Sequence, residues 1–111
     1  MITTHVLDIA RGSPAIGVTV ILEIRQASDW NPVGRGVTDA SGRLTTLTDG
    51  RELSPGTYRL IFDLGAYHRE HGVSAPFFPE AEVTFNVRDG SEHYHVPLLI
   101  SPFGYSTYRG A

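Results

Sequence analysis

The residues best suited to chemistry in this sequence are the two histidines of a His93-Tyr94-His95 motif near its end. A neutral imidazole can take a proton from water and return it, so the pair could serve in general acid–base catalysis. Side chains two residues apart on a strand are parallel, so the pair could also bind zinc, with His5 as the only obvious third ligand. Two surface histidines are a further interpretation, and the residues alone leave these alternatives open.

Signatures of other catalytic types are missing. The chain has no cysteine, which excludes thiolate catalysis and disulfides, and no Gly-x-Ser-x-Gly elbow occurs. All nine basic residues are arginine, which excludes Schiff-base lysines and a Walker A motif. The segment His68-Arg69-Glu70-His71 has its histidines one residue too close for a zincin helix and predicts an exposed helical turn. An enzyme built from this sequence would therefore activate water with histidine.

Composition places the chain among ordinary globular proteins. It has 111 residues, 41% hydrophobic and 19% charged, which predicts one domain spanning residues 1–111. The net charge of −3 gives no reason to expect a nucleic-acid partner. The longest apolar runs are about five residues, whereas a membrane helix needs roughly 20. With no signal-peptide pattern at its start, we expect a cytoplasmic protein without a membrane partner.

Alternation of polar and apolar residues dominates the chain, and it is clearest over 82–88. The only segment that predicts a helix is 64–71, which ends at Gly72. Asp39-Ala40-Ser41-Gly42 and Asp89-Gly90 predict tight hairpin turns. Together these signals predict an all-β fold, an antiparallel β-sandwich of about eight strands with one short helix. Strands are expected near 3–9, 18–24, 34–38, 43–45, 57–62, 82–88, 93–101 and 103–109.

The strand that carries the two histidines has an unusual outer face. One face is apolar and predicts the core side, with Tyr94, Val96, Leu98 and Ile100. The other face presents His93, His95, Pro97 and Leu99, which is too apolar for a plain solvated surface. We therefore expect it to be covered by another subunit or by a ligand.

Two stretches resemble a known family, the transthyretin-related proteins. His5-Val6-Leu7-Asp8 followed by Arg11-Gly12-Ser13-Pro14-Ala15 is similar to the opening of that family. Leu99-Ile100-Ser101-Pro102-Phe103-Gly104-Tyr105-Ser106-Thr107 is similar to its closing strands, and the resemblance runs over essentially the whole chain. The family has two branches, a thyroid hormone carrier and 5-hydroxyisourate hydrolase, an enzyme of urate breakdown.

Particular positions separate these branches. His5, Arg43, His95 and the closing Tyr108-Arg109-Gly110 resemble the hydrolases, whereas transthyretin has lysine, glutamate and threonine at the first three. One residue departs from the pattern, because Ala111 stands where the hydrolases have serine. The resemblance favours the hydrolase branch, with a non-catalytic carrier or interaction module as the alternative.

The resemblance also implies a reaction. Water adds to a ring carbonyl of 5-hydroxyisourate and the adjacent amide bond breaks, which opens the six-membered ring to a ureidoimidazoline. It implies water activation and proton handling by His5 and His95, and stabilisation of substrate and oxyanion by Arg43. No metal or organic cofactor is implied, and the assembly is a homotetramer, a dimer of dimers with sites where the dimers meet. The implied substrate-binding residues are Leu7, Pro97, Tyr108, Gly110 and Ala111.

Overall fold

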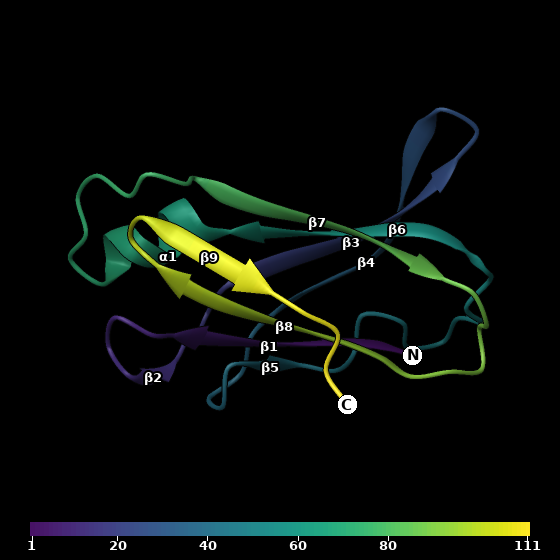
Figure 1. The fold of residues 1–111 in the computed structure, drawn as a ribbon, viewed down its shortest axis with the longest axis horizontal. Coiled ribbons are helices and arrows are strands. Elements are labelled where there is room, and N and C mark those ends of the chain that lie inside the picture. The colour runs from purple at the N-terminus through teal and green to yellow at the C-terminus, as the bar shows by residue number, and fades with distance from the viewer.

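The computed structural model describes residues 1–111 as two layers of β-strands with one short helix at one end (Figure 1). This confirms the all-β sandwich expected from the sequence. Nine strands are present, of which β2 and β5 have only two residues each. The elements are β1 (Ile2–Asp8), β2 (Ser13–Pro14), β3 (Thr19–Gln26), β4 (Asp29–Val37), β5 (Arg43–Leu44), β6 (Gly56–Asp63), α1 (Leu64–Glu70), β7 (Glu80–Val87), β8 (Tyr94–Ser101) and β9 (Gly104–Thr107).

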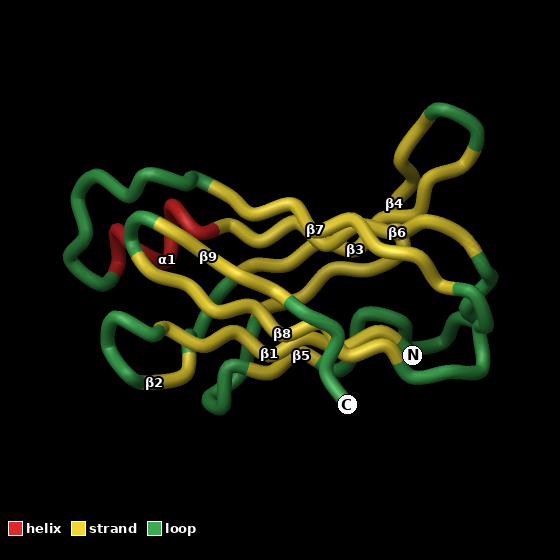
Figure 2. The backbone as a smooth tube through the Cα atoms, viewed as in Figure 1, coloured by secondary structure: helices red, strands yellow, loops and turns green.

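The strands divide into a five-stranded and a four-stranded sheet, which Figure 2 shows as two yellow layers. The four-stranded sheet has the order β4-β3-β6-β7; the other runs β2-β1-β8-β9, with β5 also paired to β1. All pairs are antiparallel except β1 and β8, which run parallel with Thr3 opposite His95. The antiparallel sandwich expected from the sequence thus contains one parallel pair. The parallel pairing makes neighbours of two segments from opposite ends of the chain.

The core lies between the two sheets, where alternate residues of each long strand meet. All four residues predicted for the inner face of β8 are buried, which confirms that face. Inner residues of β1 line the core on the side of the five-stranded sheet, and inner residues of β3 and β6 line it on the side of the four-stranded sheet. Each fully buried aliphatic side chain stabilises the fold by about 1.5 to 3 kcal/mol. Because strand side chains alternate, this burial turns Thr3, His5 and Leu7 of β1 to the outer face. The inner residues of these strands include Ile2, Val6, Val20, Leu22, Tyr58, Leu60 and Phe62.

Both hairpins expected from turn signals are wrong, because each turn carries the chain from one sheet to the other. After the Asp39–Gly42 turn, β5 pairs with β1, whereas β4 pairs with β3. The Asp89-Gly90 turn likewise joins β7 of one sheet to β8 of the other. A real hairpin was missed between β3 and β4, where Gln26 lies opposite Asp29 and Ala27 takes a positive φ of 56°. The missed turn has no glycine to signal it.

The helix matches its expected position, but one of its residues does not match its expected environment. Asp63 caps α1 by accepting a hydrogen bond from the Ala66 amide at 3.1 Å, and Gly72 beyond its end has φ 84°. The expectation of an exposed turn at His68 is wrong, because this side chain is only 2% exposed. His68 follows the buried Leu64 by four residues, and this spacing puts both on the helix face that packs inward. No helix in the structure has both the length and the apolar character needed to cross a bilayer.

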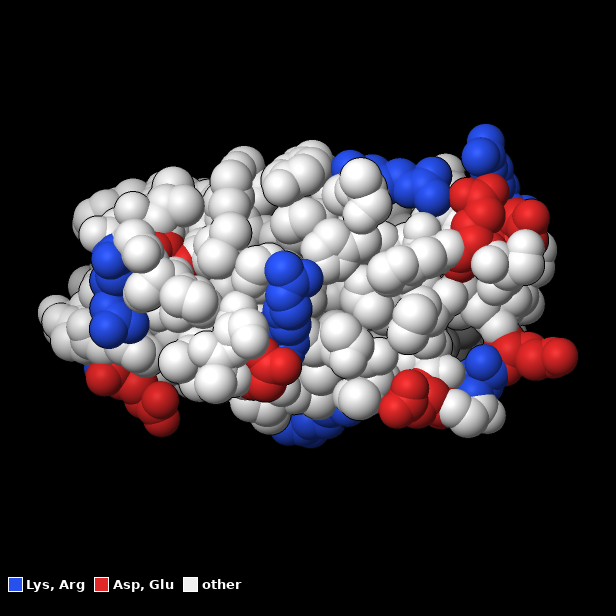
Figure 3. Space-filling model, turned by 90° about the horizontal axis from the view of Figure 1, so that it is seen from below, with Lys and Arg blue, Asp and Glu red and all other residues white.

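Figure 3 views the molecule from the side on which β1, β2 and β5 lie in Figure 1. Uncharged atoms cover most of this side, and the positive and negative groups are scattered over it rather than gathered in one patch. This side of the molecule is therefore mainly uncharged, with small groups of charges.

Candidate active site

The candidate site lies on the outer face of the five-stranded sheet, where β5, β1 and β8 are neighbours. His5 on β1 lies opposite Arg43 on β5 and opposite Pro97 on β8. His95 precedes Pro97 by two residues and shares its face. From strand spacing and rise, the Cα atoms of His5 and His95 are about 8 Å apart. The structure thus brings together the three residues expected to be catalytic, although they lie far apart in the sequence.

His95 is partly buried, and its surroundings favour the neutral form of its ring. Its Nδ1 atom lies 2.8 Å from Oγ1 of Thr3, and the same hydroxyl lies 2.8 Å from Nε2 of His93. Burial lowers the pKa of His95, and the positive charges of Arg43, His93 and His5 lower it further. The Nε2 atom has no protein partner and is not sealed from solvent. A neutral ring with an accessible nitrogen suits a base that takes a proton from water.

His5 is oriented by a main-chain carbonyl. Its Nε2 atom lies 2.9 Å from the carbonyl oxygen of Ser41, in the turn that precedes β5. A carbonyl oxygen only accepts hydrogen bonds, so Nε2 must carry a hydrogen. When the ring is neutral, Nδ1 is therefore the nitrogen that holds the lone pair. The position of the Ser41 turn thus decides which nitrogen of His5 can exchange protons.

Arg43 presents a free guanidinium to the same face. Its main-chain amide donates to the Asp39 carboxylate at 3.0 Å, and the Ser41 amide donates to the same oxygen at 2.8 Å. These two amides are the main reason that the pKa of Asp39 is lowered, with smaller contributions from the charges of Arg43 and His5. The Arg43 side chain is exposed and forms no hydrogen bond or ion pair. Its planar fork is thus available for the oxygen atoms of a substrate.

The C-terminal tail closes one side of the site. The Gly110 amide donates to the carbonyl oxygen of His95 at 2.8 Å, which pairs the tail with β8. Arg109 anchors this segment, since its guanidinium donates to the Glu92 carboxylate at 3.0 Å and lies 4.6 Å from the centre of the Tyr94 ring. Sequence reasoning missed Arg109 as an anchor. The only sequence signal for this role was that Arg109 is a charged residue between two residues expected to bind the substrate.

The remaining residues expected to bind substrate are placed unevenly. Leu7 lies opposite Leu99 on the outer face, and Pro97 is buried beside Gly110. Tyr108 is 57% exposed and lines a different groove of about 220 Å³, which also contains Phe85 of β7. This groove contains none of His5, Arg43 and His95. Ala111 is exposed at the end of the tail.

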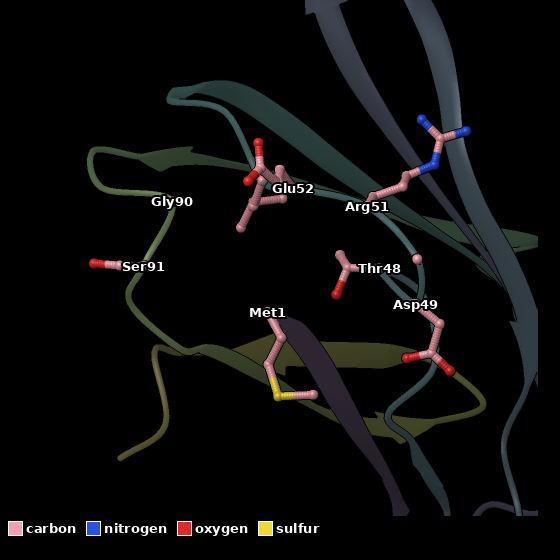
Figure 4. A pocket seen from close by; sticks show the side chains of 9 residues that line it. Met1, Thr48, Asp49, Arg51, Glu52, Gly90 and Ser91 are labelled. Atoms are coloured by element: carbon pink, nitrogen blue, oxygen red, sulfur yellow. The ribbon is translucent and has the colours of Figure 1, made fainter.

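A larger hollow of about 550 Å³ lies away from these residues, at the end of the sandwich that contains Met1 (Figure 4). Figure 4 shows the side chains of Asp49 and Arg51 pointing away from its centre rather than toward a common point. It contains none of the residues expected to act in catalysis. The structure also places no third histidine or carboxylate with His93 and His95 to complete a metal site.

Comparisons with known proteins give one family. A family model described as HIUase/Transthyretin matches residues 2–110. A probable 5-hydroxyisourate hydrolase of Caenorhabditis elegans is 47% identical over 110 residues, which cover 99% of this chain and 81% of the relative. The 5-hydroxyisourate hydrolase of Mus musculus is 40% identical over 112 residues, with 99% and 94% covered.

Solved structures from both branches of that family are similar to this fold. Klebsiella pneumoniae 5-hydroxyisourate hydrolase superposes with a TM-score of 0.85 and 38% identity, covering 99% of this chain and 97% of that chain. Sea bream transthyretin in complex with thyroxine superposes with a TM-score of 0.91 and 36% identity, covering 98% and 93%. The backbone therefore does not separate an enzyme from a carrier, and the side chains of the site must do so.

Proposed function

The chain belongs to the HIUase/transthyretin family, and within that family we propose that it acts as the hydrolase that opens the ring of 5-hydroxyisourate. The relatives that support this activity match nearly the whole chain. The single observation that carries the proposal is that His5, Arg43 and His95 meet on one sheet face. A carrier that only encloses a ligand has no need for an accessible neutral base beside a free guanidinium.

The first step that we propose is the activation of water by His95. Its neutral ring takes a proton from water at Nε2 as the water oxygen attacks the ring carbonyl carbon of the substrate. The lowered pKa of His95 favours the neutral form of its ring in the resting site at neutral pH. A base of this kind typically accelerates a reaction by about 10²- to 10⁴-fold.

Arg43 is proposed to stabilise the charge that the attack creates. The carbonyl oxygen becomes an oxyanion in the tetrahedral intermediate, and a cation beside it stabilises the transition state more than the substrate. The main-chain amides of Ser41 and Arg43 donate hydrogen bonds to Asp39, which fixes the start of β5 and the backbone position from which the Arg43 side chain extends.

The last step is cleavage of the carbon–nitrogen bond. As the tetrahedral intermediate collapses, the leaving nitrogen takes a proton from an imidazolium, which restores the neutral base. We assign His5 to this proton handling together with His95, because the Ser41 carbonyl leaves Nδ1 of His5 free to exchange a proton. The reaction adds one water and transfers no electrons, so its balance requires no cofactor.

We propose that residues 1–111 form one hydrolase domain and that it assembles as a homotetramer, a dimer of dimers. Both sheets contribute to one buried cluster, which supports a single domain. The outer face of the five-stranded sheet has Leu7, Pro97 and Leu99 beside its histidines. An apolar face of this kind is stabilised when another copy covers it, and a covered site also excludes bulk water.

The activity is tested by adding the purified protein to freshly generated 5-hydroxyisourate and following its ultraviolet absorbance. The protein should accelerate the decay well above the spontaneous rate. His95→Asn should lower the turnover by about 10²- to 10⁴-fold, and Arg43→Glu by more than about tenfold, because it puts an anion beside the developing oxyanion. Arg35→Glu makes the same charge change on an exposed position of the other sheet and should leave the rate unchanged. A wild-type rate equal to the spontaneous decay would refute the proposed function.

A further inference from the structure

The hydroxyl of Thr3 occupies a place in the site that the steps above do not use. Thr3 is only 3% exposed, although it lies on the outer side of β1. Its Oγ1 atom lies 2.8 Å from Nδ1 of His95 and 2.8 Å from Nε2 of His93. One buried hydroxyl therefore links a partly buried histidine to an exposed one.

The hydroxyl of Thr3 has only one hydrogen for its two hydrogen bonds, to His93 and to His95. A threonine hydroxyl has one hydrogen and two lone pairs, so it can donate to only one of the two histidines and must accept from at least one. If Thr3 donates to His93, Nδ1 of His95 must carry a hydrogen that Thr3 accepts. If Thr3 donates to Nδ1 of His95 instead, that nitrogen has the lone pair and Thr3 accepts a hydrogen bond from His93.

Only one of these two arrangements leaves His95 able to take a proton from water at Nε2. A neutral imidazole carries one ring hydrogen, so a hydrogen on Nδ1 leaves the lone pair on Nε2. Nε2 is the nitrogen without a protein partner, and a water molecule can reach it. In the other arrangement Nε2 carries the hydrogen and cannot take a proton from water.

We propose that Thr3 is a positioning residue for the hydrolysis, which donates its hydroxyl hydrogen to His93 and thereby holds His95 with its hydrogen on Nδ1 and its lone pair on Nε2. The inference rests on the proposed function, because it assigns the orientation of the base in that reaction. Thr3 itself does not touch the substrate in this scheme. The role resembles that of any buried acceptor that fixes the tautomer and the ring plane of a catalytic histidine.

The neighbouring residue supplies a matched control. Thr4 is also a buried threonine of β1, but its hydroxyl faces inward and donates to the main-chain oxygen of Val96 at 2.6 Å. Replacing either threonine by valine removes one buried hydroxyl at a similar cost in packing. Only the change at Thr3 removes a hydrogen-bond partner of His95.

We expect Thr3→Val to lower kcat by about 10- to 100-fold, the range seen when a partner that orients a histidine ligand is lost. KM should change by less than about threefold, because Thr3 does not bind the substrate. Thr3→Ser keeps the hydroxyl and should restore most of kcat, whereas Thr4→Val should leave both constants near those of the wild type. Thermal unfolding of all three variants verifies that each one is folded.

A second readout does not depend on activity. Nitrogen chemical shifts of 15N-histidine-labelled protein distinguish protonated from unprotonated ring nitrogens, and the signals of His95 are those that disappear in His95→Asn. The wild type should show a hydrogen on Nδ1 of His95, and Thr3→Val should show a mixture of tautomers or a hydrogen on Nε2. A hydrogen on Nε2 in the wild type overturns the inference, and so does a Thr3→Val protein with unchanged kcat and unchanged shifts. If the wild type shows the expected tautomer but no hydrolysis, the proposed function fails instead.

Discussion

The ring of His95 lies directly against the α-carbon of Gly110. A β-carbon built on this glycine would lie 2.6 Å from Cδ2 of the ring and 3.2 Å from Cγ of Pro97. The tail can therefore approach the site this closely only because residue 110 has no side chain. The close approach also fixes the side of the imidazole opposite its bond to Thr3.

Gly110→Ala should accordingly reduce hydrolysis while leaving the fold intact. The new methyl group forces either the ring of His95 or the tail to move, and a shift of about 1 Å in a catalytic group can reduce a rate by about 10²-fold. We expect a fall in kcat of about 10- to 100-fold, measured by the decay of 5-hydroxyisourate. Gly104→Ala is the control, because its β-carbon would meet only Oγ of Ser101, at 3.8 Å. Equal activity of the two variants would contradict a role for the close approach.

The pH dependence of the reaction should report the environment of His95. Burial, followed by the charges of Arg43, His93 and His5, lowers the pKa of this ring, so its neutral form persists to lower pH than that of a free imidazole. We therefore expect kcat/KM to stay level as the pH falls through the ordinary imidazole range and to decline only below it. Arg43→Gln removes one of the charges, so the titration of His95 followed by NMR should move to higher pH. A shift to lower pH would contradict this electrostatic account.

Leu99→Arg should separate the proposed tetramer into dimers. Leu99 lies on the outer face of β8 opposite Leu7, and a covered arginine without a partner costs several kcal/mol in each copy. Light scattering at micromolar concentration should show the mass of a tetramer for the wild type and of a dimer for the variant. Ile61→Arg makes a similar change on the outer face of the other sheet, and it should remain tetrameric. A wild-type protein that is monomeric at this concentration rules out the proposed assembly.

Ala111→Ser tests the one departure from the hydrolase pattern. Residue 111 is exposed at the tail, and an alanine-to-serine change at such a site normally alters the free energy of unfolding by less than about 0.5 kcal/mol. A hydroxyl that reaches the substrate or the attacking water contributes about 0.5 to 1.5 kcal/mol, or roughly a two- to tenfold gain in kcat/KM. We expect this gain without a change in Tm. If kcat/KM is unchanged, the side chain at 111 has no part in the reaction.

Much of the local structure could be predicted because it depends on short-range patterns. The alternation in β8 identified its buried face, since side chains of a strand point to opposite sides at every step. The helix after Asp63 was also predicted, together with its glycine stop at Gly72. The sequence also indicated what His5, Arg43 and His95 could do, because histidine can transfer protons and arginine can stabilise an oxyanion.

The arrangement of these residues depended on contacts between distant parts of the chain. The Asp39 turn has the same local hydrogen bonds whether it joins paired strands or carries the chain to another sheet, so its sequence could not tell which. Likewise, only the parallel pairing of β1 with β8 puts Thr3 beside His95, and nothing in the residues near Thr3 indicates a partner some 90 positions later. The sequence by itself determined which side chains can react and which faces of the strands are buried. The tertiary structure alone decided which of them meet, because strand partners are selected by packing the two sheets around a common core rather than by local preference.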